Sequence, residues 1–389
     1  MDSSTIRLSI GGAAVVGVAF GMARYAYGLT LPAIRSEFGL SELVLGAIAS
    51  GTFLGYLLGL LAAPRLSARR GPRAPTTVGG LCGVAGCVTV AGATSPWVLA
   101  AGAVLAGSAA GWVWAPYSDV VAEAVPPRHR ATVLAAITTG TSAGLVAMAG
   151  AGQLAASTSW RLAWATIAVA AGVAALLNVR TVPRLQPPRR ETTTARPSVL
   201  RRAMAAPLAY AVFYFTATTI YFTYASDAAR SGGLGPSAAP LMFAVIGLGG
   251  LVALAAGRLA NTFSAPVVGG GSVLLVSGAL IALALGRASL AAILLSALLF
   301  GAGFMVGSAV LAIWTAHVVL ERPGDAFTVA LVVGAVASIA APALMGALIP
   351  VLGLPAVLVV VGVLSSTAAA VLTVVPRARA HVPGSAVAS

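Results

Sequence analysis

Hydrophobic residues in this chain gather into long stretches, and short polar joints separate them. Each stretch holds about 20 residues or more, the length that an α-helix needs to cross the hydrocarbon core of a bilayer. The pattern predicts helices at residues 8–33, 42–63, 75–94, 97–118, 131–156, 161–179, 204–225, 238–257, 265–286, 288–317, 327–351 and 354–376. It therefore predicts an all-α membrane protein with twelve transmembrane helices.

The longest polar joint divides the predicted helices six and six. It contains Pro187, Pro188, Arg189 and Arg190, followed by a run of threonines. We expect a first six-helix bundle at residues 1–180, a cytoplasmic linker at 181–203, a second six-helix bundle at 204–376 and a cytoplasmic tail at 377–389. Two six-helix repeats of this kind enclose a substrate site near the middle of the bilayer in many transporters.

The positive charges lie mainly in the joints, and this decides the expected orientation. All 23 basic residues are arginines, and the formal net charge is +14. With a cytoplasmic N-terminus, eighteen arginines fall inside, and only Arg35, Arg161, Arg230 and Arg287 fall outside. The positive-inside rule therefore predicts cytoplasmic termini and a multi-pass protein of the inner (plasma) membrane. A nucleic-acid partner is not expected, because it would require a basic face on a soluble domain.

The composition also argues against an enzyme. Of all residues, 59% are hydrophobic and 8% are charged, and the chain contains no lysine, so it has no Walker motif for ATP. The three histidines, His129, His317 and His381, fall in a joint, at a helix end and in the tail. We therefore expect no catalytic residue, no metal site and no cofactor, and a membrane-embedded enzyme is only a remote alternative.

The joint between the second and third helices carries a family motif with several substitutions. It holds Pro64, Ala68, Arg69, Gly71 and Arg73. With the six-plus-six layout, it resembles the loop of the major facilitator superfamily, Gly-x-x-x-Asp-Arg-x-Gly-Arg-basic, although the first Gly, the Asp and one Arg are replaced. The resemblance covers essentially the whole chain. It implies a secondary transporter that works by alternating access on a small organic substrate, with protons as a second partner, as a monomer.

Two further runs resemble parts of this superfamily. The segment Gly21 to Gly28 reads Gly-Met-Ala-Arg-Tyr-Ala-Tyr-Gly and resembles the YbfB/YjiJ-type branch. On helix five, Gly140 and Gly144 resemble part of the antiporter signature Gly-Pro-x-x-Gly-Gly, although the proline is absent. The resemblance implies proton-coupled efflux of a drug-like or metabolite compound as the leading function.

Arg24 is the most informative single residue, because it lies about sixteen positions into the first helix, past the middle of the bilayer. A charged side chain there costs about 2.5–3.5 kcal/mol on insertion scales, so we expect it to face the central cavity and to have a partner. Its planar fork of donors suits an anionic or carbonyl-bearing substrate. Uptake or exchange of a small organic anion held by Arg24 is therefore the alternative function, and a purely structural Arg24 is also open.

Aromatic residues on helices one, four and seven are candidates for the rest of the substrate site. Helix seven carries Tyr210, Tyr214, Thr218, Tyr221 and Tyr224 at spacings of three and four, which places them on one face. Tyrosine offers an apolar body with a polar tip, which suits an amphipathic organic molecule. The predicted substrate-binding residues are Arg24, Tyr27, Trp112, Tyr214, Thr218 and Tyr221. The alternative is that these side chains pack between helices.

Charged residues near the predicted cytoplasmic mouth are candidates for gating. Asp119 ends helix four, and Arg69 and Arg130 lie in neighbouring joints. We predict that they form a latch, with proton exchange on Asp119 as the alternative, because burial favours a protonated carboxylate. Asp227 is expected to be a solvated cap just past helix seven. No carboxylate lies in the middle of any predicted helix, which keeps exchange or facilitated diffusion open.

Overall fold

The computed structural model describes residues 2–186, 202–320 and 323–374. Within them the chain forms helices and no strands, and twelve helical segments are long and apolar enough to cross a membrane. This confirms the predicted all-α fold with twelve candidate transmembrane helices. The predicted tail at 377–389 and most of the predicted linker at 181–203 lie outside the described residues.

Each half of the chain contributes six of these segments. In the first half they are α1 (Ser3–Val16) continued by η1 (Gly17–Ala23) and α2 (Ala26–Phe38), α3 (Glu42–Arg70), α4 (Arg73–Ala91), α5 (Pro96–Gly111) with α6 (Trp114–Ala124), α7 (Pro127–Ala155) and α8 (Trp160–Thr181). In the second half, η3 (Arg202–Met204) precedes α9 (Ala205–Ser231), α10 (Ala238–Gly249) with η4 (Gly250–Ala255) and α11 (Ala256–Phe263), α12 (Ala265–Gly286), α13 (Leu290–Val318), α14 (Pro323–Leu352) and α15 (Leu354–Val374). Three helix pairs make most of the contact between the halves, namely α2 with α9, α3 with α14, and α7 with α10.

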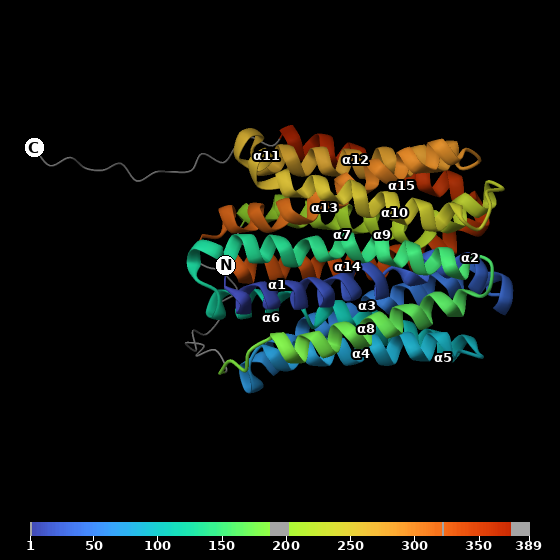
Figure 1. Cartoon of the computed structure of the whole chain (residues 1–389). Helices are drawn as coiled ribbons and strands as arrows, with labels where there is room; N and C mark the ends of the chain where they lie inside the picture. The colour runs from blue at the N-terminus through green and yellow to red at the C-terminus, as the bar shows by residue number, and fades with distance from the viewer. Residues whose placement is uncertain (1, 187–201, 321–322, 375–389) are drawn as a thin grey trace, which may run out of the picture.

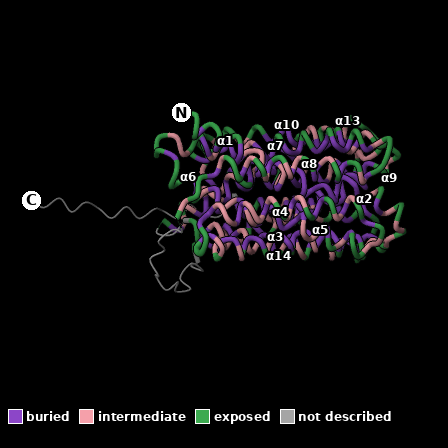
Figure 2. Tube along the Cα trace, turned by 60° about the horizontal axis from the view of Figure 1, so that its bottom comes forward, coloured by how far each residue is buried: buried purple, intermediate pink, exposed green. Residues whose placement is uncertain are grey.

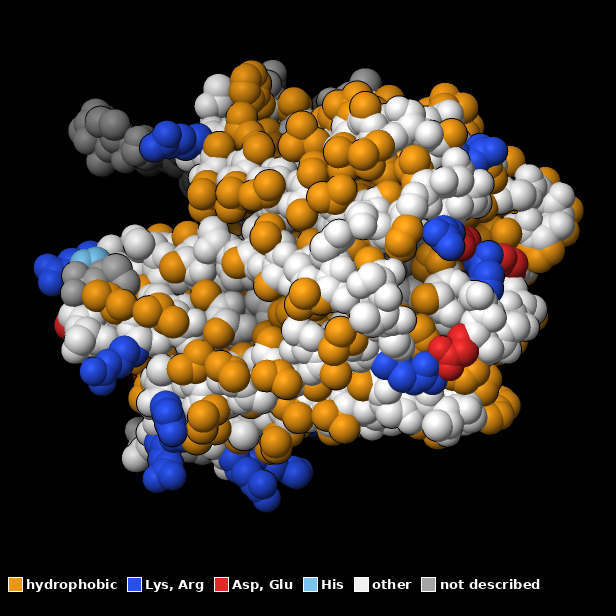
Figure 3. Space-filling view, turned by 45° about the vertical axis from the view of Figure 1, so that its right-hand side comes forward, with side chains coloured by type: hydrophobic (Ala, Val, Ile, Leu, Met, Phe, Trp, Pro, Cys, Tyr) orange, Lys and Arg blue, Asp and Glu red, His pale blue; other side chains and the backbone are white. Residues whose placement is uncertain are grey.

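The two ends of the helical bundle differ in charge. α1 begins at one end, and because successive segments run antiparallel, the α3–α4, α6–α7 and α11–α12 joints lie there too (Figure 1). We call this the arginine-rich end, and its arginines include Arg65, Arg69, Arg70, Arg73, Arg128, Arg130, Arg180 and Arg258. The other end, called the opposite end, mixes acidic and basic side chains, as Figure 3 shows. The cytoplasmic location of the arginine-rich end stays a prediction.

Serine caps define the turns at the opposite end. The side chains of Ser41, Ser95 and Ser289 accept hydrogen bonds from the backbone of the first turns of α3, α5 and α13. Such caps satisfy amide groups that a helix start leaves without partners. Gly39, with a φ of 60°, ends α2 in the left-handed region, which favours glycine. Tight turns therefore hold the ends of α2 and α3 close together.

The outer surface of the bundle is apolar, as a surface in lipid must be. Figure 2 shows exposed residues along the outer faces of the helices and buried residues along the inner faces. Leu81, Val169 and Leu285 are among the large apolar side chains that are exposed on the long helices. In water this surface would drive aggregation, whereas in a bilayer it contacts lipid tails.

Glycines bring neighbouring helices into backbone contact, as expected for association in lipid. Gly55 of α3 lies against the carbonyl oxygen of Val104 in α5, and Gly107 of α5 lies against that of Thr52. A Cβ atom at either glycine would clash with backbone, which cannot move aside as a flexible side chain can. The α3–α5 contact therefore depends on these glycines.

We expect the Gly55→Ala variant to be destabilised by about 1–3 kcal/mol, which is typical of overpacking at a tight contact. Gly172→Ala on α8 is the matched control, because a Cβ there meets nothing within 4 Å. Thermal unfolding in detergent, monitored as the loss of monodisperse protein, measures the stability of both variants. Equal unfolding temperatures for the two would contradict the close contact.

Candidate functional site

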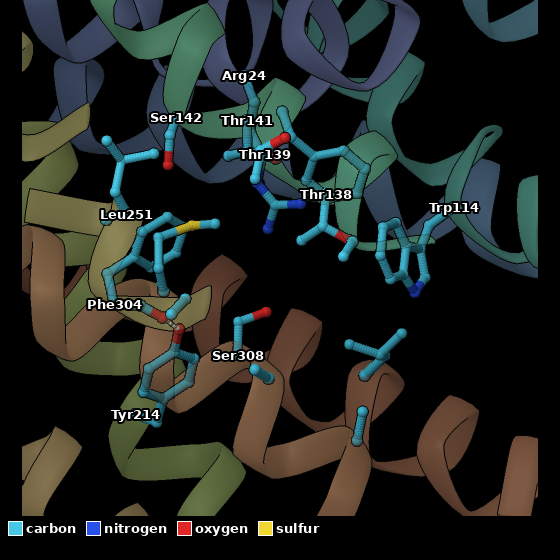
Figure 4. Close-up of a pocket in the computed structure, with 18 of the residues that line it drawn as sticks. Arg24, Trp114, Thr138, Thr139, Thr141, Ser142, Tyr214, Leu251, Phe304 and Ser308 are labelled. Carbon is cyan, nitrogen blue, oxygen red and sulfur yellow. Dashed lines mark hydrogen bonds between the residues drawn. The ribbon is translucent and has the colours of Figure 1, made fainter. Parts of the chain in front are cut away.

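A cavity of about 300 Å³ lies between the two halves of the protein. The first half lines it with Phe20, Arg24, Tyr25, Tyr56, Trp114, Ala135, Thr138, Thr139, Thr141 and Ser142. The second half lines it with Tyr214, Phe215, Gly250, Leu251, Ala253, Leu254, Phe304, Met305, Ser308, Ala309, Ala312, Phe327 and Leu331. The lining is mostly apolar, and a charged group is contributed by Arg24. Figure 4 shows the side chains of both halves around this space.

A break in the first helical segment positions Arg24. The preceding stretch, η1, has π-helical hydrogen bonding, and Arg24 and Tyr25 lie between η1 and α2, outside both elements. Segments of π-helix inside a longer helix are often found at functional sites, because the extra residue redirects side chains. The guanidinium of Arg24 points into the cavity, and the hydroxyl of Ser308 points into the same space from α13 (Figure 4).

Aromatic rings surround the guanidinium of Arg24. Its central carbon lies 3.9 Å from the ring centroid of Tyr56 and 5.1 Å from that of Phe53. The rings of Phe20 and Tyr25 lie within 5.7 Å. Cation–π contacts stabilise the positive charge but use the ring faces, so they leave the N–H donors without acceptors. These rings therefore contact the guanidinium through their faces in an otherwise apolar environment.

The N–H donors of Arg24 have no carboxylate partner within the described part of the chain. Arg24 is only 4% exposed, and its Nε is buried without a hydrogen bond. None of the salt bridges among the described residues includes Arg24. A buried donor without an acceptor is costly, and a buried cation without an anion is more so. Among the described residues, Arg24 thus lacks an anionic acceptor, and its role in substrate binding stays a prediction.

The structure places the other predicted substrate-binding residues in two groups. Tyr214 lines the cavity, and its hydroxyl donates to the carbonyl oxygen of Phe304. Tyr27, Thr218 and Tyr221 are buried outside the cavity lining. Their hydroxyls are bonded within the protein, to the Leu45 carbonyl at 3.0 Å, to the Tyr214 carbonyl at 2.8 Å and to Ser296 at 2.8 Å respectively. The tyrosine face of helix seven is mainly a packing face, and the binding role of these three residues stays a prediction.

Trp112 was predicted to bind the substrate, but Trp114 is the tryptophan that lines the cavity. Trp112 packs against Gly59 of α3 and Gly79 of α4, away from the cavity. The physical reason is a break between α5 and α6 at Trp112 and Val113. This break rotates the following residues relative to a continuous helix, and Trp114 then faces inward.

The predicted gating residues all lie at the arginine-rich end. Asp119 is exposed on α6, and Arg69 is exposed in the last turn of α3. Arg130 is half-buried near the start of α7, and its Nε donates to the carbonyl oxygen of Val125 at 2.9 Å. A latch formed by these residues stays a prediction.

An ion-pair cluster at the opposite end connects the two halves, and the sequence analysis missed it. Arg35 of α2 contacts Glu42 of α3 at 2.8 Å and Asp227 of α9 at 2.9 Å. Asp227 is not a solvated cap past helix seven, because α9 continues to Ser231 and Asp227 is only 7% exposed. Its position three residues after Tyr224 was the available signal, since that spacing continues the buried tyrosine face.

A second ion pair at this end stays within the first half. Arg161 of α8 contacts Glu37 of α2 at 2.7 Å, and the indole N–H of Trp160 donates to the same carboxylate. This pair fixes α2 to α8. It provides a natural comparison for the Arg35 cluster, which crosses between the halves.

Close contacts between the halves close the cavity toward the opposite end. The ring of Tyr25 stacks on that of Phe222 with centroids 3.6 Å apart. Next to it, Gly28 of α2 packs on the backbone of Phe222, and Gly46 of α3 packs on that of Pro342. Toward the arginine-rich end, by contrast, the cavity reaches Ala135 and Phe327, which lie eight and four residues after the starts of α7 and α14. The structure is thus closed at the opposite end and open toward the arginine-rich end.

Solved transporter structures share this architecture. A D-xylose-proton symporter gives a TM-score of 0.77 at 17% sequence identity, over 94% of this chain and 96% of that chain. The xylose transporter XylE from E. coli, in a partially occluded inward-open conformation, gives 0.76 at 15% identity, over 96% and 98%. The nucleoside transporter NupG gives 0.71 at 11% identity, over 95% and 98%. At these identities the likeness shows the fold alone.

The sequence comparisons identify the family. No curated protein sequence matches the chain. The sequence model of the Major Facilitator Superfamily matches residues 13–342, most of the chain. The YbfB/YjiJ-type branch stays a prediction. Together with the twelve helices and the central cavity, this match shows that the chain belongs to the major facilitator superfamily of secondary transporters.

Proposed function

We propose that this protein transports a small organic anion by alternating access and that Arg24 binds the anionic group. The observation that carries the proposal is the buried guanidinium of Arg24, which points into the cavity and has no carboxylate partner among the described residues. Guanidinium binds carboxylate or phosphate through two parallel hydrogen bonds, which are about twice as strong as neutral ones. An anionic substrate would supply the acceptors that Arg24 lacks.

The remaining walls of the cavity favour an apolar body on this anion. Phe304, Met305 and Leu331 contribute apolar surface, whereas Ser142 and Ser308 contribute hydroxyls. A pocket with few polar groups orients its ligand through those groups and holds the rest by burial of apolar surface. Aromatic or branched aliphatic carboxylates meet both requirements.

The contacts between the halves support alternating access. With the arginine-rich end in the cytoplasm, the structure is an inward-open state of a plasma-membrane protein. The Arg35–Asp227 pair and the Tyr25–Phe222 stack then form the outer gate. Both must separate for the cavity to open outward, since they join the first membrane segment to α9.

Proton-coupled efflux of a drug-like compound, the leading expectation from the resemblance, has less support from the cavity. None of the described residues that line it is Asp or Glu. A proton carrier in contact with the substrate is therefore lacking in the lining, and exchange or downhill transport of the anion fits the geometry better. The monomeric state and the movement of protons with the substrate stay predictions.

Proteoliposomes that contain the purified protein test the proposed function. We expect exchange of radiolabelled benzoate against internal benzoate, and less than about one tenth of that rate for benzamide, which has the same shape without the charge. An imposed pH gradient in the same vesicles reports proton coupling. Equal transport of benzoate and benzamide would contradict the anion site. The absence of transport for every member of a panel of aromatic, aliphatic and phosphorylated anions would contradict it as well.

A further inference from the structure

The eighth membrane segment loses α-helical geometry beside the cavity. α10 packs closely on α7 up to Gly250, where Gly247 lies against the Ser142 carbonyl and Gly250 lies against the Ser142 hydroxyl. From Gly250 to Ala255 the chain continues as the 3-10 helix η4. Beyond that point, α11 packs on α12, α13 and η4. The contact between the eighth membrane segment and α7 is thus concentrated in the residues before η4, toward the opposite end.

The exposed surface of the end of α10 and of η4 continues from the outside of the protein into the cavity. Leu248 and Val252 are 58% and 48% exposed and do not line the cavity. Leu251 and Leu254 line the cavity and are nevertheless 46% and 66% exposed. A helix at the edge of a sealed bundle would bury the residues between its outer face and its inner face. Here the exposed arc runs from one face to the other.

The facing side of this opening belongs to α7. Ala135 is exposed and Thr138 is half-buried, and both line the cavity. We use the term lateral gap for the opening bounded by Leu251 and Leu254 on η4 and by Ala135 and Thr138 on α7. The two walls of the gap are apolar apart from one hydroxyl, which is bonded to the Leu134 carbonyl at 2.7 Å.

The equivalent seam on the other side of the cavity is sealed. There α3 packs on α14, and Tyr56, Leu60 and Ala335 are at most 4% exposed within one apolar cluster. The cavity is therefore open on one flank and closed on the other. This asymmetry distinguishes the lateral gap from a general widening of the cavity toward the arginine-rich end.

The lateral gap lies at a depth where lipid tails surround the protein. Leu254 precedes the end of α11 at Phe263 by nine residues, about 13 Å at about 1.5 Å per residue. The headgroup region of a leaflet is only about 6 Å thick. The exposed leucines therefore lie at the depth of the hydrocarbon core if the helix ends lie at the membrane surface.

We propose that the lateral gap is a portal to the lipid leaflet at the arginine-rich end and that the substrate class is an amphiphilic anion. This inference rests on the proposed function, because Arg24 is taken to bind the anionic head. The cavity of about 300 Å³ is at the lower end for small-molecule sites, so a longer tail must extend beyond it. The gap gives that tail an apolar path, and the bilayer concentrates amphiphiles at this depth.

Spin labels distinguish a lipid portal from a water-filled mouth without any transport measurement. Cys82 and Cys87 are first replaced by Ala, and single cysteines at Leu251 and Leu254 are labelled in proteoliposomes. A portal predicts that both labels collide with oxygen more than with nickel ethylenediaminediacetate, as a label at Leu248 does. A label at Arg69 supplies the aqueous reference. Nickel-dominated collisions at Leu251 and Leu254 would overturn the portal, whatever the substrate proves to be.

Transport measurements test the substrate class. Dodecanoate and benzoate serve as probes with the same head and different tails. We expect Leu254→Trp, which narrows the gap, to slow dodecanoate transport about 10-fold more than it slows benzoate transport, since only the long tail needs the lateral path. Leu248→Trp, on the outer face, is the matched control and should change neither. Equal slowing of both probes, or of neither, would contradict the amphiphile proposal. Failure of the wild type to transport these two carboxylates and every other member of the anion panel would contradict the proposed function itself.

Discussion

We expect the Arg24→Gln variant to lose binding of organic anions almost completely while the empty protein becomes more stable. Removing one member of a buried, hydrogen-bonded charge pair costs about 2–5 kcal/mol of binding free energy. At about 1.4 kcal/mol per factor of ten, this corresponds to a loss of affinity of about 30-fold to several thousand-fold. The empty protein, by contrast, no longer carries a buried cation without an anion. Isothermal titration calorimetry with benzoate measures the loss of affinity. Thermal unfolding without ligand measures the gain in stability.

The opposite signs of these effects separate a substrate-binding Arg24 from a structural one. If Arg24 held helices together through its ring contacts, Arg24→Gln would lower the unfolding temperature and binding together. Arg24→Lys is the informative intermediate, because lysine keeps the charge but lacks the planar fork, so partial binding is expected. Arg230→Gln, an exposed arginine at the opposite end, is the control for a general effect of charge.

The twelve helices could be predicted because the signal for each helix lies within its own stretch of sequence. An apolar stretch of membrane length followed by arginines is recognisable without knowledge of its neighbours. The predicted ends were less accurate, as α3 continues to Arg70 beyond the predicted end at residue 63. The arginines in this joint have high helix propensity, so the helix extends past its apolar part.

The candidate site could be predicted only in part, because it depends on breaks and on neighbours. Arg24 was recognisable, since a charge deep in an apolar stretch needs an explanation by itself. The π-helical turn that directs it, and the break that turns Trp114 inward instead of Trp112, have no periodic signal. The tyrosines of α9 formed the predicted face, but their partners, such as Ser272 and Ser296, lie on other helices. Periodicity identifies a face, and only the tertiary structure shows what covers it.

We expect the Asp227→Asn variant to favour the outward-open state, because the Arg35–Asp227 contact joins the halves at the opposite end. Hydrogen bonds to charged groups contribute about 1.5–3 kcal/mol, so the ratio of outward-open to inward-open protein should rise about 10- to 150-fold. Spin labels at Thr94 in the first half and Ser231 in the second half, both exposed at this end, report the separation of the halves by double electron–electron resonance. The expected result is a new population at longer distance.

Glu37→Gln is the matched control for this gate. It removes an ion pair of similar geometry at the same end, but that pair connects α2 and α8 within one half. A contact within one half moves as part of a rigid unit and has equal strength in both states, so its loss cannot shift the equilibrium between them. We therefore expect an unchanged distance distribution in Glu37→Gln. The same shift in both variants would mean that charge at this end, and not the link between the halves, sets the conformation.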